Sequence, residues 1–169
     1  MPDPRKVYWD ACNFLSYING VPDRTPVLEE LLRQSKAREI RIFTSTVSIV
    51  EVAFASQEQA GKALSDEQEQ QIDDLWSDAE AIALVEFHAM IATEARRIIR
   101  VGLPKGWSLK AADAIHLATA KRVKVAEVHT YDDKLDRYAD EIGIKICRPY
   151  TPQGVLDLPG KDSPPEPVS

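Results

Sequence analysis

The chain has 169 residues, of which 44% are hydrophobic and 28% are charged. This length supports one globular domain with a buried core, and the hydrophobic fraction excludes a mainly disordered chain. There are 21 Lys and Arg residues against 27 Asp and Glu residues, which gives a net charge of −6. Overall charge therefore does not drive binding to nucleic acid, which would require a local basic patch or metal ions.

Membrane and secretory classes are also disfavoured by the sequence. No apolar stretch approaches the roughly 20 residues that span a bilayer, and the first residues carry no signal-peptide core. The two cysteines, Cys12 and Cys147, are too few for a disulfide scaffold or a cysteine zinc site. We expect a cytoplasmic protein without a membrane partner.

Short apolar runs alternate with longer helical patterns, which is typical of a parallel sheet covered by helices. The first part of the chain predicts a strand over 7–9, a helix over 14–18, a helix over 27–37, a strand over 40–43 and a helix over 46–57. The remainder predicts an acidic helix over 65–80, a strand over 82–87, helices over 89–101 and 109–122, a strand over 125–130, a helix over 133–141 and a strand over 144–147.

These elements predict an α/β domain over residues 1–150, with a central parallel sheet of four to five strands flanked by helices. Residues 151–169 contain five prolines and two glycines. Such a composition buries too little apolar surface to offset its ordering entropy, so we predict a flexible, disordered tail there.

Two acidic residues stand at the ends of predicted strands. Asp10 directly follows the first strand, and Asp132 follows the strand over 125–130 by two residues. Ligands of open parallel sheets bind at the carboxyl ends of the strands, so both acids are candidate site residues. Each is also explained as a helix cap, because Asp is a favoured cap residue. Asp133 is then an ordinary first-turn acid.

Two further acids lie within apolar helical patterns, Glu51 and Asp113. Burial of an unpaired charge is costly, and Asp is unfavourable inside helices, so each needs a reason for its position. For Glu51 the alternative is a salt bridge to a Lys or Arg. For Asp113 it is a place in the first helical turn, if the helix begins later than predicted.

Together the four acids predict a cation site, because clustered carboxylates repel one another unless a cation is shared. Oxygen ligands of this kind suit Mg²⁺ or Mn²⁺. No cluster of His and Cys competes for zinc in this interpretation, and the three histidines are taken as core-edge or surface residues: His88, His116 and His129. A supporting role at the site stays open for His116, one turn after Asp113.

Four motifs carry these acids: Asp-Ala-Cys-Asn-Phe-Leu at 10–15, Ser-Ile-Val-Glu-Val at 48–52, Ala-Asp-Ala-Ile-His-Leu-Ala-Thr-Ala at 112–120 and Thr-Tyr-Asp-Asp-Lys-Leu at 130–135. Their order and spacing over residues 7–148 resemble the signature segments of PIN-domain ribonucleases, many of which are VapC-type toxins. The resemblance implies a parallel sheet that gathers acids around one or two Mg²⁺ or Mn²⁺ ions. Carried over, these acids are Asp10, Glu51, Asp113 and Asp132.

The resemblance also implies an RNA substrate, a cognate antitoxin and a homodimer. The chain departs from the family at Cys12, where a small hydroxyl residue or Asn is usual. The acidic helix and the proline-rich tail make it longer than the compact toxins.

Five basic residues and no acid lie between Glu94 and Asp113: Arg96, Arg97, Arg100, Lys105 and Lys110. We predict that Arg96, Arg97 and Lys110 bind RNA phosphates, although a solvated helix face has the same pattern. Trp107 either stacks on a base or anchors its loop. We also place Asn13 and Thr130, from the first and last motifs, among the substrate-binding residues. The helix over 65–80 has seven acids and no base, and should face away from RNA.

The sequence thus predicts a metal-dependent endoribonuclease, the toxin of a type II toxin–antitoxin pair, whose metals orient a water for in-line attack on a phosphodiester. One alternative is a catalytically inactive PIN-like module that binds RNA or a protein. Another is a phosphatase-like or receiver-like α/β domain, which leaves Glu51 unexplained.

Overall fold

The structure is a computed structural model that describes residues 2–52, 61 and 63–152. The predicted helix over 46–57 is therefore described only as far as residue 52. Most of the predicted tail, from residue 153 onward, also lies outside the described residues.

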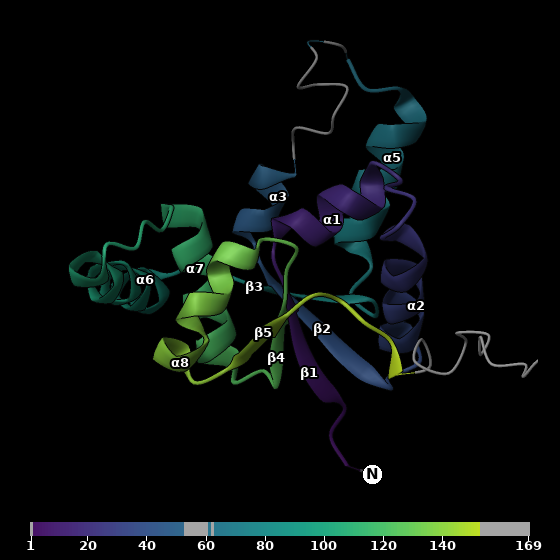
Figure 1. Cartoon of the computed structure of the whole chain (residues 1–169). Helices are drawn as coiled ribbons and strands as arrows, with labels where there is room; N and C mark the ends of the chain where they lie inside the picture. Colours follow the sequence, from purple (N-terminus) through teal and green to yellow (C-terminus); the bar gives the residue numbers. More distant parts are fainter. Residues whose placement is uncertain (1, 53–60, 62, 153–169) are drawn as a thin grey trace, which may run out of the picture.

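A sheet of five parallel strands forms the centre of the fold, in the order β3-β2-β1-β4-β5 (Figure 1). The strands are β1 (Arg5–Trp9), β2 (Ile40–Ser45), β3 (Ile82–Val85), β4 (Glu127–His129) and β5 (Lys145–Cys147). Tyr8 lies opposite Phe43 of β2, and Trp9 lies opposite His129 of β4. The predicted α/β class, with its central parallel sheet, is confirmed.

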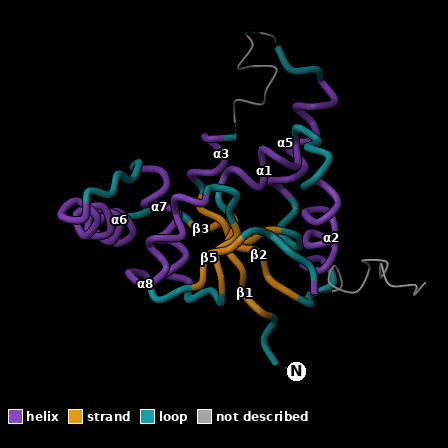
Figure 2. Tube along the Cα trace, viewed as in Figure 1, coloured by secondary structure: helices purple, strands orange, loops and turns teal. Residues whose placement is uncertain are grey.

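Helices cover both faces of this sheet, as Figures 1 and 2 show. They are α1 (Ala11–Ile18), α2 (Thr25–Lys36), α3 (Val47–Glu51), α5 (Asp66–Ser77), α6 (Ala89–Gly102), α7 (Ala111–Val123) and α8 (Ala139–Ile142), with 3-10 segments η1 (Leu103–Lys105) and η2 (Asp133–Tyr138). Residues of α1, α2 and α5 share one buried cluster, and residues of α6, α7 and α8 share the other.

The alternation of side chains along β1 divides the core between these two layers. Tyr8 belongs to the cluster with α6 and α7, whereas Val7 and Trp9 belong to the cluster with α1 and α2. All three side chains are fully buried. A strand buried on both faces reads as a continuous apolar run, which is the pattern of residues 7–9.

Several predicted elements have other bounds in the structure; β3 and β4, for example, are shorter than the strands predicted over 82–87 and 125–130. Two helical predictions also differ. The helix predicted over 109–122 begins at Ala111, because Lys110 has the extended backbone of a helix cap. The segment predicted as a helix over 133–141 is η2 followed by α8, which ends at the left-handed Gly143. The first difference matters for the site, because it places Asp113 in the first turn of α7.

The chain order reverses beside β1. From β1 the chain passes to β2 and β3 on one side, and then crosses to β4 and β5 on the other. Such a switch point is where open α/β sheets bind ligands, outside the carboxyl ends of the strands. Here it lies between Trp9 at the end of β1 and His129 at the end of β4.

Candidate metal centre

Asp10 directly follows β1, and only 5% of its surface is exposed. It occupies the N-cap position of α1 but makes no side-chain cap hydrogen bond, so capping does not account for its carboxylate. Oδ1 instead accepts hydrogen bonds from Cys12 Sγ at 2.7 Å and Asn13 Nδ2 at 3.1 Å. Oδ2 accepts one from Thr130 Oγ1 at 2.5 Å. These three donors hold the carboxylate in one orientation.

Asn13 and Thr130, which we placed among the substrate-binding residues, are both buried. Besides binding Asp10, Asn13 Nδ2 donates to the carbonyl oxygen of His129 at 2.7 Å. Thr130 Oγ1 accepts the backbone N–H of Asp132 at 3.0 Å. Because Asn13 Nδ2 and Thr130 Oγ1 are bonded inside the protein, the geometry supports a role in orienting Asp10. The buried Oδ1 of Asn13 has no hydrogen-bond partner among the described residues.

Asp113 is the third residue of α7, where the helix dipole favours a negative charge. The first-turn alternative is thus confirmed for its position. Burial is the main cause that raises the pKa of Asp113 above its ordinary value. The charges of Asp10, Asp132 and Glu51 raise this pKa further, while His116 lowers it. These couplings show that the four acids share one region of the molecule.

Glu51 is the last residue of α3, and 27% of its side chain is exposed. Its Oε2 lies 2.5 Å from Nε2 of His116. The partner of this carboxylate is therefore a histidine, not the Lys or Arg of the alternative interpretation. His116 is only 1% exposed, so its interpretation as a core-edge or surface residue is wrong.

Asp132 caps η2, because its Oδ1 accepts the backbone N–H of Lys134 at 3.0 Å. The cap interpretation is therefore confirmed for one oxygen of this carboxylate. Its neighbour Asp133 points elsewhere and forms an exposed ion pair with Arg148 at 2.9 Å. Of the adjacent pair, Asp132 is the residue that is electrostatically coupled to Asp113.

The two neighbouring acids should behave differently when each is replaced by alanine. We expect Asp132→Ala to raise the metal concentration needed for cleavage, because it removes a charge coupled to Asp113. Asp133→Ala should leave the metal requirement unchanged and cost at most about 1 kcal/mol of stability, since its ion pair is exposed. A metal titration of cleavage for both variants measures this. A larger shift in Asp133→Ala would reverse the assignment.

The charges of the four acids affect one another, but the four side chains are not arranged around one point. Burial is the main cause that raises the pKa of Asp10, and Glu51 adds to it, while His116 and the bonds from Cys12 and Thr130 lower it. No Lys or Arg pairs with any of the four acids in the part of the chain that the structure describes. The region thus combines carboxylates with little compensating charge, which fits a divalent cation.

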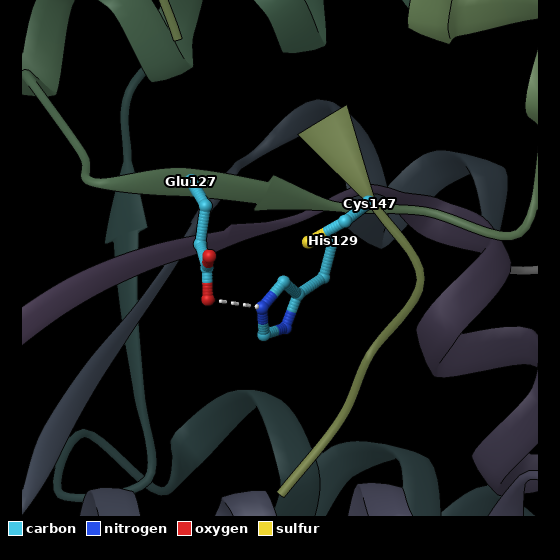
Figure 3. Close-up of side chains that lie close together, drawn as sticks. All are labelled: Glu127, His129 and Cys147. Atoms are coloured by element: carbon cyan, nitrogen blue, oxygen red, sulfur yellow. Dashed lines mark hydrogen bonds and ion pairs between the residues drawn. The ribbon is translucent and has the colours of Figure 1, made fainter. Parts of the chain in front are cut away.

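The structure contains a second group of potential metal ligands, which is not predicted from the sequence. Glu127 and His129 of β4 point toward Cys147 of β5, with one ligand atom of each lying within 4.8 Å of the others (Figure 3). His129 lies opposite Cys147 in the register of the two strands. The expectation that no His and Cys residues cluster is therefore wrong. Both cysteines are free thiols, as expected.

Glu127 is already neutralised by neighbouring groups. Its oxygens lie 3.2 Å from Arg5 Nη1 and 3.4 Å from Lys145 Nζ, and they accept hydrogen bonds from Tyr150 Oη at 3.2 Å and His129 Nε2 at 3.0 Å. The bond from His129 is the main cause that lowers the pKa of Glu127 to about 2. Two cations here oppose binding of a third, so we interpret this group as an ion-pair network that joins β1, β4, β5 and Tyr150.

The predicted RNA-binding residues lie on α6 and at the start of α7. Arg96 and Arg97 are exposed on α6, and Lys110 is the exposed N-cap of α7, three residues before Asp113. Arg97 is paired with Glu94 at 2.8 Å. Lys110 is therefore placed best to meet a phosphate at the acids, and Arg97 is placed less well because its charge is compensated.

Trp107 packs into the core beside α6 and α7, with its ring 5.2 Å from that of Tyr138 in an edge-on arrangement. This supports the loop-anchor alternative over base stacking. The acidic α5 shares a buried cluster with α1 and α2, on the sheet face opposite α6 and α7 (Figure 1). That it faces away from RNA stays a prediction.

A hollow of about 880 Å³ lies between α1, α2 and α5 and not at the acids. It is lined by residues such as Leu32, Asp66 and Leu75, and by none of the predicted site residues. The acidic lining of this hollow is unsuited to a nucleic acid. The four candidate acids instead occupy the open end of the sheet.

Two contributors to the site are not predicted from the sequence. Cys12 Sγ donates to Asp10 and accepts the backbone N–H of Tyr131 at 3.2 Å, so the thiol replaces the family's hydroxyl. Burial is the main cause that raises the pKa of Cys12, which keeps it a thiol. Tyr8, which binds His116 at 2.7 Å, is hidden within an apolar strand pattern. The only signal in the sequence was the departure from the family pattern at Cys12. No signal pointed to Tyr8.

Comparison with known proteins agrees with this arrangement. The family model of the PIN domain matches residues 7–141. A comparison with curated protein sequences finds no match. No helix in the described ranges is long and apolar enough to cross a membrane.

Solved toxin–antitoxin structures share the fold at low sequence identity. VapBC2 from Rickettsia felis, bound to a promoter DNA fragment, is 17% identical with a TM-score of 0.61, covering 83% of this chain and 96% of that chain. VapC20 from Mycobacterium tuberculosis, a toxin that cleaves the sarcin-ricin loop, is 12% identical with a TM-score of 0.56, covering 75% and 90%. A toxin–antitoxin complex from Klebsiella pneumoniae is 20% identical with a TM-score of 0.54, covering 85% and 98%.

Proposed function

Because this chain belongs to the PIN domain family, we propose that it is a metal-dependent endoribonuclease and the toxin of a type II toxin–antitoxin pair. The observation that carries the proposal is the carboxylate of Asp10, which is buried beside the switch point of the sheet and held by Cys12, Asn13 and Thr130. The charges of Asp10, Glu51 and Asp132 all act on Asp113. Such a site is built to hold a cation beside a phosphate, and the cytoplasm is where its RNA substrate would be met.

The donor set fits Mg²⁺ or Mn²⁺. Carboxylate oxygens are the ligands that these hard cations prefer, and both keep positions for water and substrate phosphate. Asp10 and Asp113 would hold the ion, with Glu51 and Asp132 completing the set from either side. A bound ion supplies a Lewis acid and an activated water for hydrolysis of a phosphodiester.

The chain's own groups contribute orientation and proton transfer. Cys12, Asn13 and Thr130 fix the carboxylate of Asp10, so its oxygens face the site without rearrangement. A carboxylate that is not held by metal accepts the proton of the attacking water. Lys110, at the start of the helix that carries Asp113, binds the phosphate backbone. The products would be a 5′-phosphate and a 3′-hydroxyl.

RNA affinity should depend on basic residues that take no part in the chemistry. Replacing Arg96, Arg97 and Lys110 together by alanine is expected to weaken binding and flatten its salt dependence. The slope of log affinity against log salt should fall by roughly one unit for each phosphate that is no longer neutralised. Among single variants, Lys110→Ala should have the largest effect and Arg97→Ala the smallest. A triple variant with the wild-type salt dependence would remove these residues from the RNA interface.

Two protein partners are part of the proposal. The solved structures that share the fold include complexes of a toxin with its antitoxin, and we expect a cognate antitoxin encoded directly upstream. We also propose a homodimer. Leu28 and Leu31 of α2 are buried in the core, whereas Ile49 and Val50 of α3 are 38% and 70% exposed and are available to a second copy.

Cleavage assays of the purified chain on single-stranded and structured RNA test the activity. We expect cleavage with Mg²⁺ or Mn²⁺ and none after EDTA, restored when the metal is added in excess. Cleavage that survives chelation, or that Zn²⁺ alone supports best, would contradict the metal assignment. RNA or protein binding without any cleavage would favour the inactive module.

A further inference from the structure

A buried chain of hydrogen bonds leads from the centre of the sheet to Glu51. The hydroxyl of Tyr8 on β1 lies 2.7 Å from Nδ1 of His116 on α7, and Nε2 of His116 lies 2.5 Å from Oε2 of Glu51 on α3. Tyr8 is fully buried and His116 is 1% exposed. Three elements that are far apart in the sequence therefore meet in one line of polar contacts.

The carboxylate of Glu51 determines which nitrogen of His116 donates. A carboxylate only accepts hydrogen bonds, so Nε2 of His116 carries a hydrogen and donates it to Oε2 of Glu51. In the neutral ring Nδ1 is then the acceptor and takes the hydrogen of the Tyr8 hydroxyl, whose oxygen accepts the backbone N–H of Ser45 at 3.0 Å. A charged imidazolium would also donate from Nε2, so both protonation states bind Glu51.

Glu51 depends on this contact for its orientation. It ends a helix of only five residues, and a free glutamate side chain has several rotatable bonds whose fixing costs conformational entropy. His116 cannot move easily, because its side chain is buried and its ring packs edge-on against Tyr8. With Oε2 bound to His116, the carboxylate lies near enough to Asp10 and Asp113 for its charge to raise the pKa of both.

We propose that His116 is a positioning residue, which holds Glu51 in place for the divalent cation and is itself held by Tyr8. The inference rests on the proposed function, because it concerns the same cation site. Partners of this kind typically contribute roughly 10–100-fold to metal affinity. Removing the hydrogen bond to Glu51 should therefore raise the metal concentration required while leaving the rate at saturating metal close to that of the wild type.

The test compares two replacements of His116 in the full chain by calorimetric titration with Mn²⁺ alone. His116→Gln keeps an N–H donor near the position of Nε2, whereas His116→Leu keeps similar bulk and removes the donor. We expect Mn²⁺ affinity to fall roughly 10–100-fold in His116→Leu and to be largely restored in His116→Gln. His129→Gln, at the other fully buried histidine, is the matched control and should bind Mn²⁺ as the wild type does.

Cleavage of RNA across a range of Mn²⁺ concentrations gives the second readout. The His116→Leu curve should move to higher Mn²⁺ with a similar maximum. Wild-type affinity in His116→Leu would overturn the inference, whereas a wild type that binds no Mn²⁺ would overturn the proposed function instead. If thermal unfolding shows that His116→Leu does not fold, Tyr8→Phe decides: a several-fold loss of Mn²⁺ affinity supports the positioning role, and unchanged affinity overturns it.

Discussion

Replacing Asp113 with asparagine is expected to reduce RNA cleavage by about 10³-fold or more, and Asp10→Asn should do the same. Each substitution removes a charged ligand from the proposed cation site. A bound metal is worth several kcal/mol of transition-state stabilisation, and about 4 kcal/mol corresponds to 10³-fold. The rate of cleavage at saturating Mn²⁺, measured beside the wild type, gives this ratio.

Neither variant should lose its fold. The pKa of each carboxyl is raised in the folded state, chiefly by burial, so its ionised form opposes folding at neutral pH. Asparagine removes that cost, and thermal stability in EDTA should hold or rise. Asp133→Asn is the control, because its carboxylate is exposed and paired with Arg148. An unfolded variant, or one with the wild-type rate, would favour a structural role for the acid.

Glu127→Gln is expected to have the largest effect on stability without changing the chemistry. The substitution leaves Arg5 and the buried His129 without their charged partner. Removing one member of a buried pair costs about 3 kcal/mol or more, but the partial exposure of Arg5 and Lys145 reduces this to roughly 2–3 kcal/mol. The melting temperature should fall by roughly 5–10 °C for a domain of this size.

The pH dependence of this effect has a defined sign. The folded pKa of Glu127 is lowered from 4.5 to about 2, so its ionisation stabilises the fold above pH 4.5 and that contribution is lost as the pH falls toward 2. Denaturant unfolding of wild type and Glu127→Gln should therefore converge over this range. Glu39→Gln, in an exposed pair with Arg33, is the control and should change little. A stable Glu127→Gln protein with impaired metal-dependent cleavage would instead make the group of Figure 3 a metal site.

The layers of the fold could be predicted because the apolar patterns are unambiguous. A fully apolar run such as residues 7–9 is expected to form a strand, and this prediction is confirmed. The structure shows in addition that the strand is buried. The beginning of α7 could not be located by pattern alone. Leu109 continues the apolar stripe, but the chain becomes helical only after the extended Lys110.

The candidate acids could be chosen because chemistry and position coincide in the sequence. Asp10 ends a strand, and a strand end near the switch point is a ligand site in any sheet of this kind. The sequence could not show which side chains orient the candidate acids. Asn13 and Thr130 belong to the same motifs as the acids, and only the structure shows their side chains buried against Asp10.

The network around Glu127 could not be predicted, because it depends on strand register. His129 meets Cys147 only because β4 and β5 pair with these residues opposite each other. Tyr150 reaches the same carboxylate from beyond β5. A charged residue in a predicted buried strand, Glu127, was the one available signal that a compensating group must lie nearby.

The position of bound Mn²⁺ tests the central claim most directly. Crystals of the full chain soaked in Mn²⁺ give an anomalous scattering peak at each occupied site. We expect a peak between Asp10 and Asp113, lost in Asp113→Asn crystals, and no peak at Glu127. A peak at Glu127, His129 and Cys147 with none at the four acids would contradict the proposed metal centre.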